Sequence, residues 1–311
     1  MRVFVTGAGG FLGHAVLSRG AQLRHEMRAH VGPPGFHGIR PCPDVPTVHA
    51  DIEDVDALRS LAAGADVVVH LAGPAAVAAS FDDAAEYLRA HVLGTEAIVR
   101  LCRTLDVPRL VYVSSAEVYG QPPRSPVPED APLRPRSPYG AAKVGAEGVV
   151  GAAVRGQGLD AVVLRPFSVY GPAMRVTSVV GTIVTQALAG DEIQLFDTRV
   201  VRDFCLVDDV AEAVWAACTT VPPLTGLRVY NVGSGRGTSM AELARTAFAV
   251  LARSGRVTQR AGQDRPAAAD IVELVADVAA AQRDLGWQAE TPLPIGLRRT
   301  LDWWKAAVAH R

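Results

Sequence analysis

Apolar runs of strand length alternate with helical patterns through the first half of the chain. The apolar runs cover residues 2–6, 26–31, 65–71, 110–114 and 161–164. Between them, residues 81–105 and 140–156 carry helical spacing, for example at Leu88, Val92, Ala97 and Leu101. Strands that alternate with helices imply right-handed crossovers and a parallel sheet with helices on both faces. The pattern therefore predicts an α/β fold built on a doubly wound parallel sheet.

The pattern of predicted strands and helices changes after about residue 166. A strand pattern at 228–232 and amphipathic helical patterns at 239–251 and 294–308 predict a second, smaller lobe, partly interleaved with the first. We expect a first domain of residues 1–165 with contributions from about 200–235, and a C-terminal lobe formed mainly by residues 166–311. Residues 121–138 hold seven prolines and predict a rigid loop. Residues 233–239 (GSGRGTS) lack the GKS/T ending of a P-loop, so they predict a turn with Ser239 as a helix N-cap.

Composition and charge narrow the class of protein. With 49% hydrophobic and 20% charged residues, the chain has ordinary globular composition. Its 31 basic and 32 acidic residues give a net charge of −1, which excludes a basic field for nucleic acid or an anionic membrane. The four cysteines lie far apart without CxxC pairs, so neither a disulfide framework nor zinc is predicted. Because Met1 leads directly into the first strand and no apolar stretch is long enough to cross a bilayer, we expect a soluble, cytoplasmic protein.

The first predicted strand ends in a glycine turn, TGAGGFLG, at residues 6–13. Its spacing fits GxxGxxG at Gly7, Gly10 and Gly13. Such a turn lets backbone N–H groups at the start of the next helix face a pyrophosphate, where the helix dipole also favours an anion. The turn therefore predicts a dinucleotide site in a Rossmann-type domain.

The second predicted strand lacks the residue that usually selects the cofactor. It ends in Val31-Gly32, with neither an acid for the ribose 2′-hydroxyl nor an unambiguous arginine for a 2′-phosphate, although Arg28 and His30 are nearby. NAD is the expected cofactor, and NADP is left open. His25 and His30 are five residues apart rather than the four of HExxH, so no metal site is predicted.

Tyr139 and Lys143 are four residues apart, which places a phenol and an ammonium on one face of a helix. Only two of the 31 basic residues are lysines, Lys143 and Lys305, so this spacing stands out. A nearby ammonium stabilises phenolate, and we therefore expect Lys143 to lower the pKa of Tyr139. Ser115 follows the predicted strand at 110–114, where a sheet of this type collects reacting groups.

These motifs, in this order, resemble one protein family. They are the glycine turn, DIED at 51–54, HLAG at 70–73, Ser115, Tyr139 with Lys143, RPFSVYGP at 165–172 and RDF at 202–204. The set is similar to that of the extended short-chain dehydrogenase/reductases, in the NAD-dependent nucleotide-sugar epimerase/dehydratase group. The similarity runs from Met1 to about Trp304.

The resemblance implies a set of site residues. The cofactor-binding set is Gly7, Gly10, Phe11, Leu12, Gly13, Asp51, Ile52, Leu71, Ala72, Gly73, Tyr139 and Lys143, with Asp51 and Ile52 at the adenine. Tyr139 would act as the base, with Lys143 and Ser115 completing a catalytic triad. Arg202 and Arg265 match the arginines that hold the substrate pyrophosphate, and Ser168 lies in a segment that touches the sugar nucleotide.

The implied function is modification of a nucleotide-diphosphate sugar by transient oxidation, commonly at C4, in a homodimer. Glu117 matches a glutamate of the family's dehydratases and decarboxylases, which favours elimination or decarboxylation. Ala116 stands where the family's 4,6-dehydratases have an aspartate, which argues against 4,6-dehydration as the elimination reaction. An epimerase in which Glu117 only caps the loop is an equally good interpretation.

Three departures from the family pattern bear on the substrate and the cofactor. His91 and Ser168 each replace a usual asparagine, and the ribose acid is missing. The missing acid favours an NADPH-dependent keto-sugar reductase as an alternative. A non-catalytic dinucleotide sensor is a further alternative, against which the intact Ser115, Tyr139 and Lys143 set argues.

Overall fold

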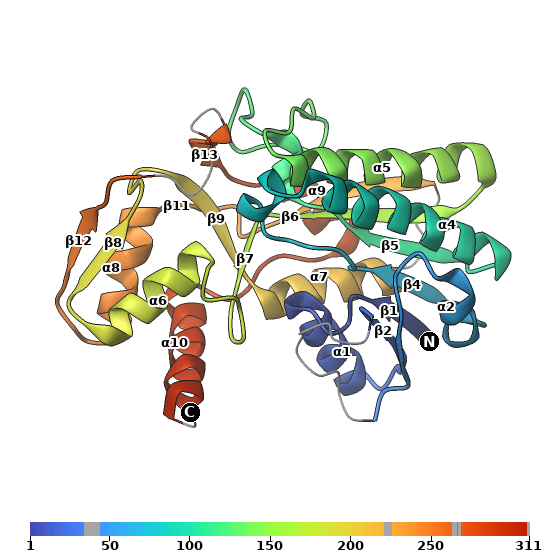
Figure 1. Cartoon of the computed structure of the whole chain (residues 1–311), viewed down its shortest axis with the longest axis horizontal. Helices are drawn as coiled ribbons and strands as arrows, with labels where there is room; N and C mark the ends of the chain where they lie inside the picture. The colour runs from blue at the N-terminus through green and yellow to red at the C-terminus, as the bar shows by residue number, and fades with distance from the viewer. Residues whose placement is uncertain (34–43, 221–225, 263–265, 267–268, 310–311) are drawn as a thin grey trace.

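A computed structural model describes residues 1–33, 44–220, 226–262, 266 and 269–309. Its centre is a seven-stranded sheet whose neighbouring strands all pair in parallel. In spatial order the strands are β10 (Leu227–Val232), β6 (Asp160–Pro166), β5 (Arg109–Val113), β4 (Val67–His70), β1 (Arg2–Thr6), β2 (Glu26–Val31) and β3 (Thr47–His49). The predicted Rossmann-type, doubly wound fold is confirmed (Figure 1).

Helices cover both faces of this sheet. One face packs on α1 (Phe11–Gln22), α7 (Val207–Thr219) and α9 (Ala279–Leu285), and the other on α2 (Val55–Ala62), α4 (Gly94–Thr104) and α5 (Pro138–Gln157). Successive side chains of a strand point to opposite faces, so Val3 and Val5 enter the first core while Phe4 enters the second.

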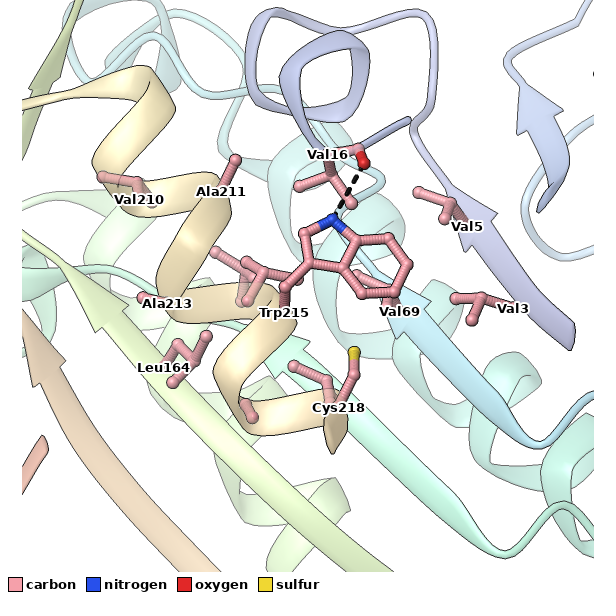
Figure 2. Packing of buried hydrophobic residues seen from close by; sticks show 14 of the residues in the cluster. Val3, Val5, Val16, Val69, Leu164, Val210, Ala211, Ala213, Trp215 and Cys218 are labelled. Carbon is pink, nitrogen blue, oxygen red and sulfur yellow. Dashed lines mark hydrogen bonds between the residues drawn. The ribbon is translucent and has the colours of Figure 1, made fainter. Parts of the chain in front are cut away.

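Trp215 of α7 lies at the centre of the first core (Figure 2). Its indole Nε1–H donates to the carbonyl of Val16 in α1 at 3.0 Å, so the polar atom of this buried ring is satisfied. A Cβ on Gly20 would collide with the indole, and this glycine therefore allows α1 and α7 to pack closely.

The second lobe contains two small sheets. Strand β9 (Val201–Leu206) pairs with β7 (Ser168–Tyr170), β11 (Gly237–Ser239) and β13 (Glu273–Leu274), while β8 (Glu192–Leu195) pairs with β12 (Arg256–Gln259). Helices α6 (Val179–Ala189), α8 (Met240–Val250) and α10 (Leu293–Ala309) share a third core with these strands. Ser239 caps α8 by accepting from the backbone N–H of Glu242, as predicted.

The helical pattern at 81–105 is not one helix. It contains α3 (Ala84–Leu88), a π-helix at Arg89–Leu93 and then α4. A π-turn adds a residue and so rotates the preceding helical segment relative to the next one. Leu88 is consequently exposed, whereas Tyr87 and His91 point into the protein.

The other predicted elements agree closely with the sequence pattern. The strands expected at 2–6 and 26–31 are found at those bounds. Strand β10 lies at the edge of the central sheet beside β6, although the next strand, β11, belongs to the second lobe. Within the described ranges, every helix is too short or too polar to cross a bilayer.

Candidate active site

Four of the motifs singled out in the sequence converge at the carboxyl ends of β1, β4 and β5. Sites of doubly wound sheets form at this edge, because loops leave the strands there. The glycine turn comes after β1, the HLAG segment continues from β4, and Ser115 comes after β5. Tyr139 and Lys143 reach the same edge from the first turns of α5.

The glycine turn is built for close backbone approach. Gly7 has φ +70°, and a Cβ on it would lie 2.7 Å from the backbone nitrogen of Ala72. A Cβ on Gly13 would collide with the carbonyl oxygen of Gly7. Gly10, in contrast, has one neighbour, the Gly7 oxygen, 3.1 Å from a built Cβ. Gly7 and Gly13 are therefore required for the close packing of the backbone. Gly10 has no side chain that would cover the start of α1.

The start of α1 is suited to an anion. Its N-cap, Gly10, supplies no side-chain hydrogen bond, and the first turn of α1 holds no acidic residue. Helices α2, α5, α6 and α8 are instead capped by Asp54, Ser137, Ser178 and Ser239. The first N–H groups of a helix have no intrahelical partner, so those of α1 can receive a phosphate. This geometry fits the pyrophosphate of a dinucleotide.

Two buried histidines brace the turn from behind. His30 Nε2 lies 3.0 Å from the carbonyl oxygen of Ala50, and the backbone N–H of Gly7 points at His30 Nδ1 at 3.5 Å. His70 bridges Thr6 and Thr95 at 2.7 and 3.1 Å. Burial lowers the pKa of both rings, that of His70 strongly, so both are neutral structural groups. Arg28 donates to the carbonyl oxygens of Leu61 in α2 and of Ala63 just after α2. These bonds within the protein hold its guanidinium in place.

The residues expected at the adenine lie beyond β3. Ile52 is buried and packs against Gly94 at the start of α4. The Asp51 carboxylate accepts from the backbone N–H of Glu53 at 3.1 Å and pairs with Arg89 at 3.3 Å. Arg89 also pairs with Glu53 and Glu86, so this rim carries a network of surface charges.

Tyr139 lies in a largely aromatic pocket. The rings of His91 and Tyr87 approach it edge-on, with centroids at 5.5 and 6.1 Å. The nearby Ser115 side chain lowers the pKa of this phenol. The expected lowering of the Tyr139 pKa was wrong: burial raises the pKa of Tyr139 to about 12, and the charge of Glu117 adds to the rise. Desolvation of a phenolate outweighs the effect of Ser115.

Lys143 is buried next to this phenol. Its Nζ donates to the carbonyl oxygen of Val113 at 2.8 Å and lies 6.0 Å from the centroid of the Tyr139 ring. Burial lowers the pKa of Lys143 to about 7, whereas the negative charge of Glu147 raises it. Lys143 therefore titrates near neutrality, in contrast to an ordinary surface lysine.

His91 supports the turn after β4. Its Nε2 lies 2.8 Å from the carbonyl oxygen of Pro74, and a Cβ on Gly73 would collide with the imidazole. Burial lowers the pKa of His91 to about 3, so the ring is neutral, donates from Nε2 and leaves Nδ1 without a partner. The π-turn, which the sequence pattern did not reveal, brings His91 to this position.

The expected substrate residues lie on adjacent strands of the second lobe. Ser168 on β7 is opposite Phe204 on β9, and Arg202 lies two residues earlier on β9. Arg202 is buried and donates to the carbonyl oxygen of Val201. Arg265 lies outside the described residues. Asp203, next to Arg202, has a structural role that the sequence did not reveal: it accepts from Ser234, Gly235 and Ala276 and so holds the glycine-rich turn.

Comparison with known proteins agrees with this geometry. The profile of the family described as "NAD dependent epimerase/dehydratase family" matches residues 3–233. The chain is 31% identical to a UDP-glucose 4-epimerase of Mycolicibacterium smegmatis over 319 residues, covering 98% of this chain and 99% of that protein. It is also 31% identical to a dTDP-glucose 4,6-dehydratase of that organism, covering 98% and 94%. Among solved structures, TunA, an NAD-dependent NDP-hexosamine 5,6-dehydratase of tunicamycin biosynthesis, superposes with a TM-score of 0.87 at 31% identity, covering 98% of each chain.

Proposed function

The chain belongs to the NAD-dependent epimerase/dehydratase family, and from this premise we propose that it modifies a nucleoside-diphosphate sugar by transient oxidation of a sugar carbon, commonly C4. The observation that carries the proposal is the meeting of Tyr139, Lys143 and Ser115 at the strand edge where the glycine turn lies. A bound nicotinamide supplies the oxidation and the later reduction.

The side chains of the site have separate roles in binding the sugar hydroxyl and moving its proton. Ser115 lies near enough to Tyr139 to lower its pKa, so the two hydroxyls can contact one sugar hydroxyl. Tyr139 takes the proton of that hydroxyl as it becomes a carbonyl, and Lys143 supports the developing phenolate with its positive charge. The pocket of Tyr87 and His91 keeps water from the phenol.

Arg202 and Ser168 are the groups proposed to hold the sugar nucleotide. A protein with a net charge of −1 cannot attract a dianion by its overall field, so placed cations must do so. A guanidinium suits a pyrophosphate because it donates two parallel hydrogen bonds and keeps its charge. We propose the same role for Arg265 from its place in the sequence.

Elimination is the second candidate reaction, and Glu117 favours it. The Glu117 carboxylate is near enough to Tyr139 to raise its pKa, so an acid/base group stands beside the proposed base. After oxidation at C4, such a group could remove or deliver a second proton. An epimerase needs no second acid/base group, because the keto-sugar has only to rotate in the pocket before it is reduced again.

We also propose that the protein works in the cytoplasm as a homodimer. Leu88 and Leu93 at the two ends of the π-helix expose 46% and 53% of their surface, and a second copy could cover them. Light scattering of the purified protein tests this directly: a monomer at micromolar concentration would contradict it.

The decisive experiment for the reaction has two steps. Mass spectrometry first identifies the dinucleotide released from purified protein, and the protein is then incubated with UDP-, dTDP- and GDP-sugars. We expect bound NAD and a product that is either an isomer of the substrate or the substrate less one water, without net change in NAD. Stoichiometric consumption of NADPH would identify a ketoreductase instead, and no turnover of any sugar nucleotide would reject the substrate class.

A further inference from the structure

Helix α5 carries two buried charges against the end of β5. Lys143 Nζ donates to the carbonyl of Val113 at 2.8 Å, and the hydroxyl of the next residue, Ser114, donates to Glu147 Oε1 at 2.5 Å. Lys143 and Glu147 are four residues apart and so share a face of the helix. Consecutive residues of the strand end thus hold the ammonium and the carboxylate in neighbouring positions.

Arg165 of β6 fixes the carboxylate from the other side. Its Nε and Nη2 donate to Oε1 and Oε2 of Glu147 at 3.0 and 2.6 Å, while Nη1 donates to the Tyr119 hydroxyl and the Glu129 carbonyl. The side chains of Arg165 and Glu147 are 5% and 9% exposed. A planar fork held at both ends leaves the carboxylate little rotational freedom.

The other groups around Lys143 carry no negative charge. The Tyr112 ring of β5 lies 5.0 Å from Nζ and the Tyr139 ring 6.0 Å away, and these aromatic faces offset only part of the cost of burying the ammonium. His70 from β4 and His91 from the π-helix also face Lys143, and protonation of either ring would oppose its charge. Among these groups only Glu147 is a carboxylate, and its charge raises the pKa of Lys143 against the effect of burial.

We propose that Glu147 is a positioning residue, whose carboxylate, clamped by Arg165 and Ser114, keeps the buried Lys143 ammonium charged beside Tyr139. The chemical use of that charge rests on the proposed function, but the electrostatic effect of Glu147 on Lys143 does not. Removing the anion leaves the Lys143 ammonium buried without the nearby carboxylate, so Lys143 should lose its proton at lower pH.

The lysine content of the chain allows a direct measurement. Lys143 and Lys305 are its only lysines, and Lys305 on α10 has a side chain that is 52% exposed. In full-length protein labelled with ¹³C,¹⁵N-lysine, NMR titration of the side-chain Cε and Nζ signals resolves both pKa values, with Lys305 as internal reference. Glu147→Gln should lower the pKa of Lys143 by about one pH unit or more and leave Lys305 unchanged.

Two further variants complete the test. Glu129→Gln is the matched control, because Glu129 accepts from the backbone of Asn231 in the same polar network and does not face Lys143. It should leave the Lys143 titration as in the wild type. Glu147→Asp keeps a carboxylate one methylene further away, so its Lys143 pKa should fall between the wild type and Glu147→Gln.

The outcomes separate positioning from a purely structural role. If Glu147 only stabilised the fold, its loss would admit water and raise the pKa of Lys143 toward that of Lys305. An unchanged or raised Lys143 pKa in Glu147→Gln therefore overturns the proposal. Should that variant not fold, a Lys143 pKa in Glu147→Asp at or above the wild-type value does the same.

Activity supplies a second measurement. Turnover that needs charged Lys143 is lost as pH rises through its pKa, and in Glu147→Gln this loss should move to lower pH. If no sugar nucleotide is turned over, the proposed function fails, while the NMR result still decides whether Glu147 keeps Lys143 charged.

Discussion

At Tyr139, burial and the Ser115 side chain act on the phenol in opposite directions. Burial raises the pKa of Tyr139 to about 12, while Ser115 lowers it. A phenol with so high a pKa is a poor base at neutral pH unless positive charge stands beside it. Lys143 is the nearby side chain that can carry this charge, which makes its protonation state the controlling variable.

Removing the phenol hydroxyl should therefore abolish proton transfer while keeping the pocket. Tyr139→Phe is expected to lower turnover at least about a hundredfold, the usual scale for a placed base, with sugar-nucleotide affinity largely kept. Tyr87→Phe is the control, since the Tyr87 hydroxyl donates to the carbonyl of Ala76 away from the reaction, and its effect should be much smaller. Steady-state kinetics of both variants would contradict the assignment if Tyr139→Phe stayed active, and Glu117 would then be the first candidate base.

Arg202 is expected to act on one ligand only. Arg202→Ala should weaken binding of UDP or dTDP and of their sugars by roughly 1.5–3 kcal/mol, because it removes a charge-assisted hydrogen bond, and leave NAD affinity almost unchanged. Calorimetric titrations of nucleotide and of NAD read the two sites separately. Arg199→Ala is the matched control, since this neighbouring side chain is 82% exposed and should affect neither ligand. Loss of both affinities would show that Arg202 supports the fold instead.

At the scale of elements, the glycine turn joins β1 to α1 and meets the residues after β4. Gly7 and Gly13 let three backbone segments touch, whereas a Cβ on Gly10 would meet only the Gly7 oxygen, at 3.1 Å. The three glycines of one motif therefore serve two different purposes, packing and access for the cofactor.

This division predicts opposite outcomes for two substitutions. Gly10→Val should still fold, with only a small loss of melting temperature, because its backbone is extended and the Gly7 oxygen, 3.1 Å from a built Cβ, has to give only slightly, but it should lose NAD binding. Gly13→Ala should lose about 1–3 kcal/mol of stability through overpacking against Gly7 and Ala8. Calorimetric melting and NAD titration measure both effects, and undiminished NAD affinity in Gly10→Val would contradict the placement of the pyrophosphate.

At the scale of the whole molecule, buried neutral histidines couple the fold to pH. His30, His70 and His91 come from three separate elements around the site, and burial lowers the pKa of each, that of His91 to about 3. In the unfolded chain they titrate near 6.5. As pH falls below 6.5 the unfolded chain binds protons that the folded chain cannot, so the folded state loses stability.

The free energy of unfolding should accordingly fall between pH 6.5 and pH 5. Each histidine adds at most about 1.4 kcal/mol per pH unit, which limits the three together to about 4 kcal/mol per pH unit. Urea unfolding at several pH values measures the slope. The His91→Gln side chain keeps an N–H that can donate to the Pro74 carbonyl but cannot titrate. The slope of the unfolding free energy against pH should therefore become shallower by up to the contribution of one histidine. An unchanged slope would show that His91 takes up its proton in the folded state as well.

Local sequence determined much of the fold and the candidate site. The strands β1 and β2, the glycine turn, the N-cap Ser239 and the Tyr139–Lys143 face all depend on residues a few positions apart. Side-chain alternation, turn chemistry and helical spacing act over that range, so a pattern in the sequence is enough to reveal them.

The tertiary structure decided what those residues experience. The clamp on Glu147 of helix α5 comes from Arg165, 18 residues away in strand β6, and Asp203 holds Ala276 from 73 residues away. The π-turn that points His91 inward is stabilised by packing on the loop after β4, which no spacing at 81–105 reveals. The pKa of Tyr139 moved opposite to the expectation, because desolvation depends on everything that packs around a group, whereas spacing along one helix reports only its neighbours.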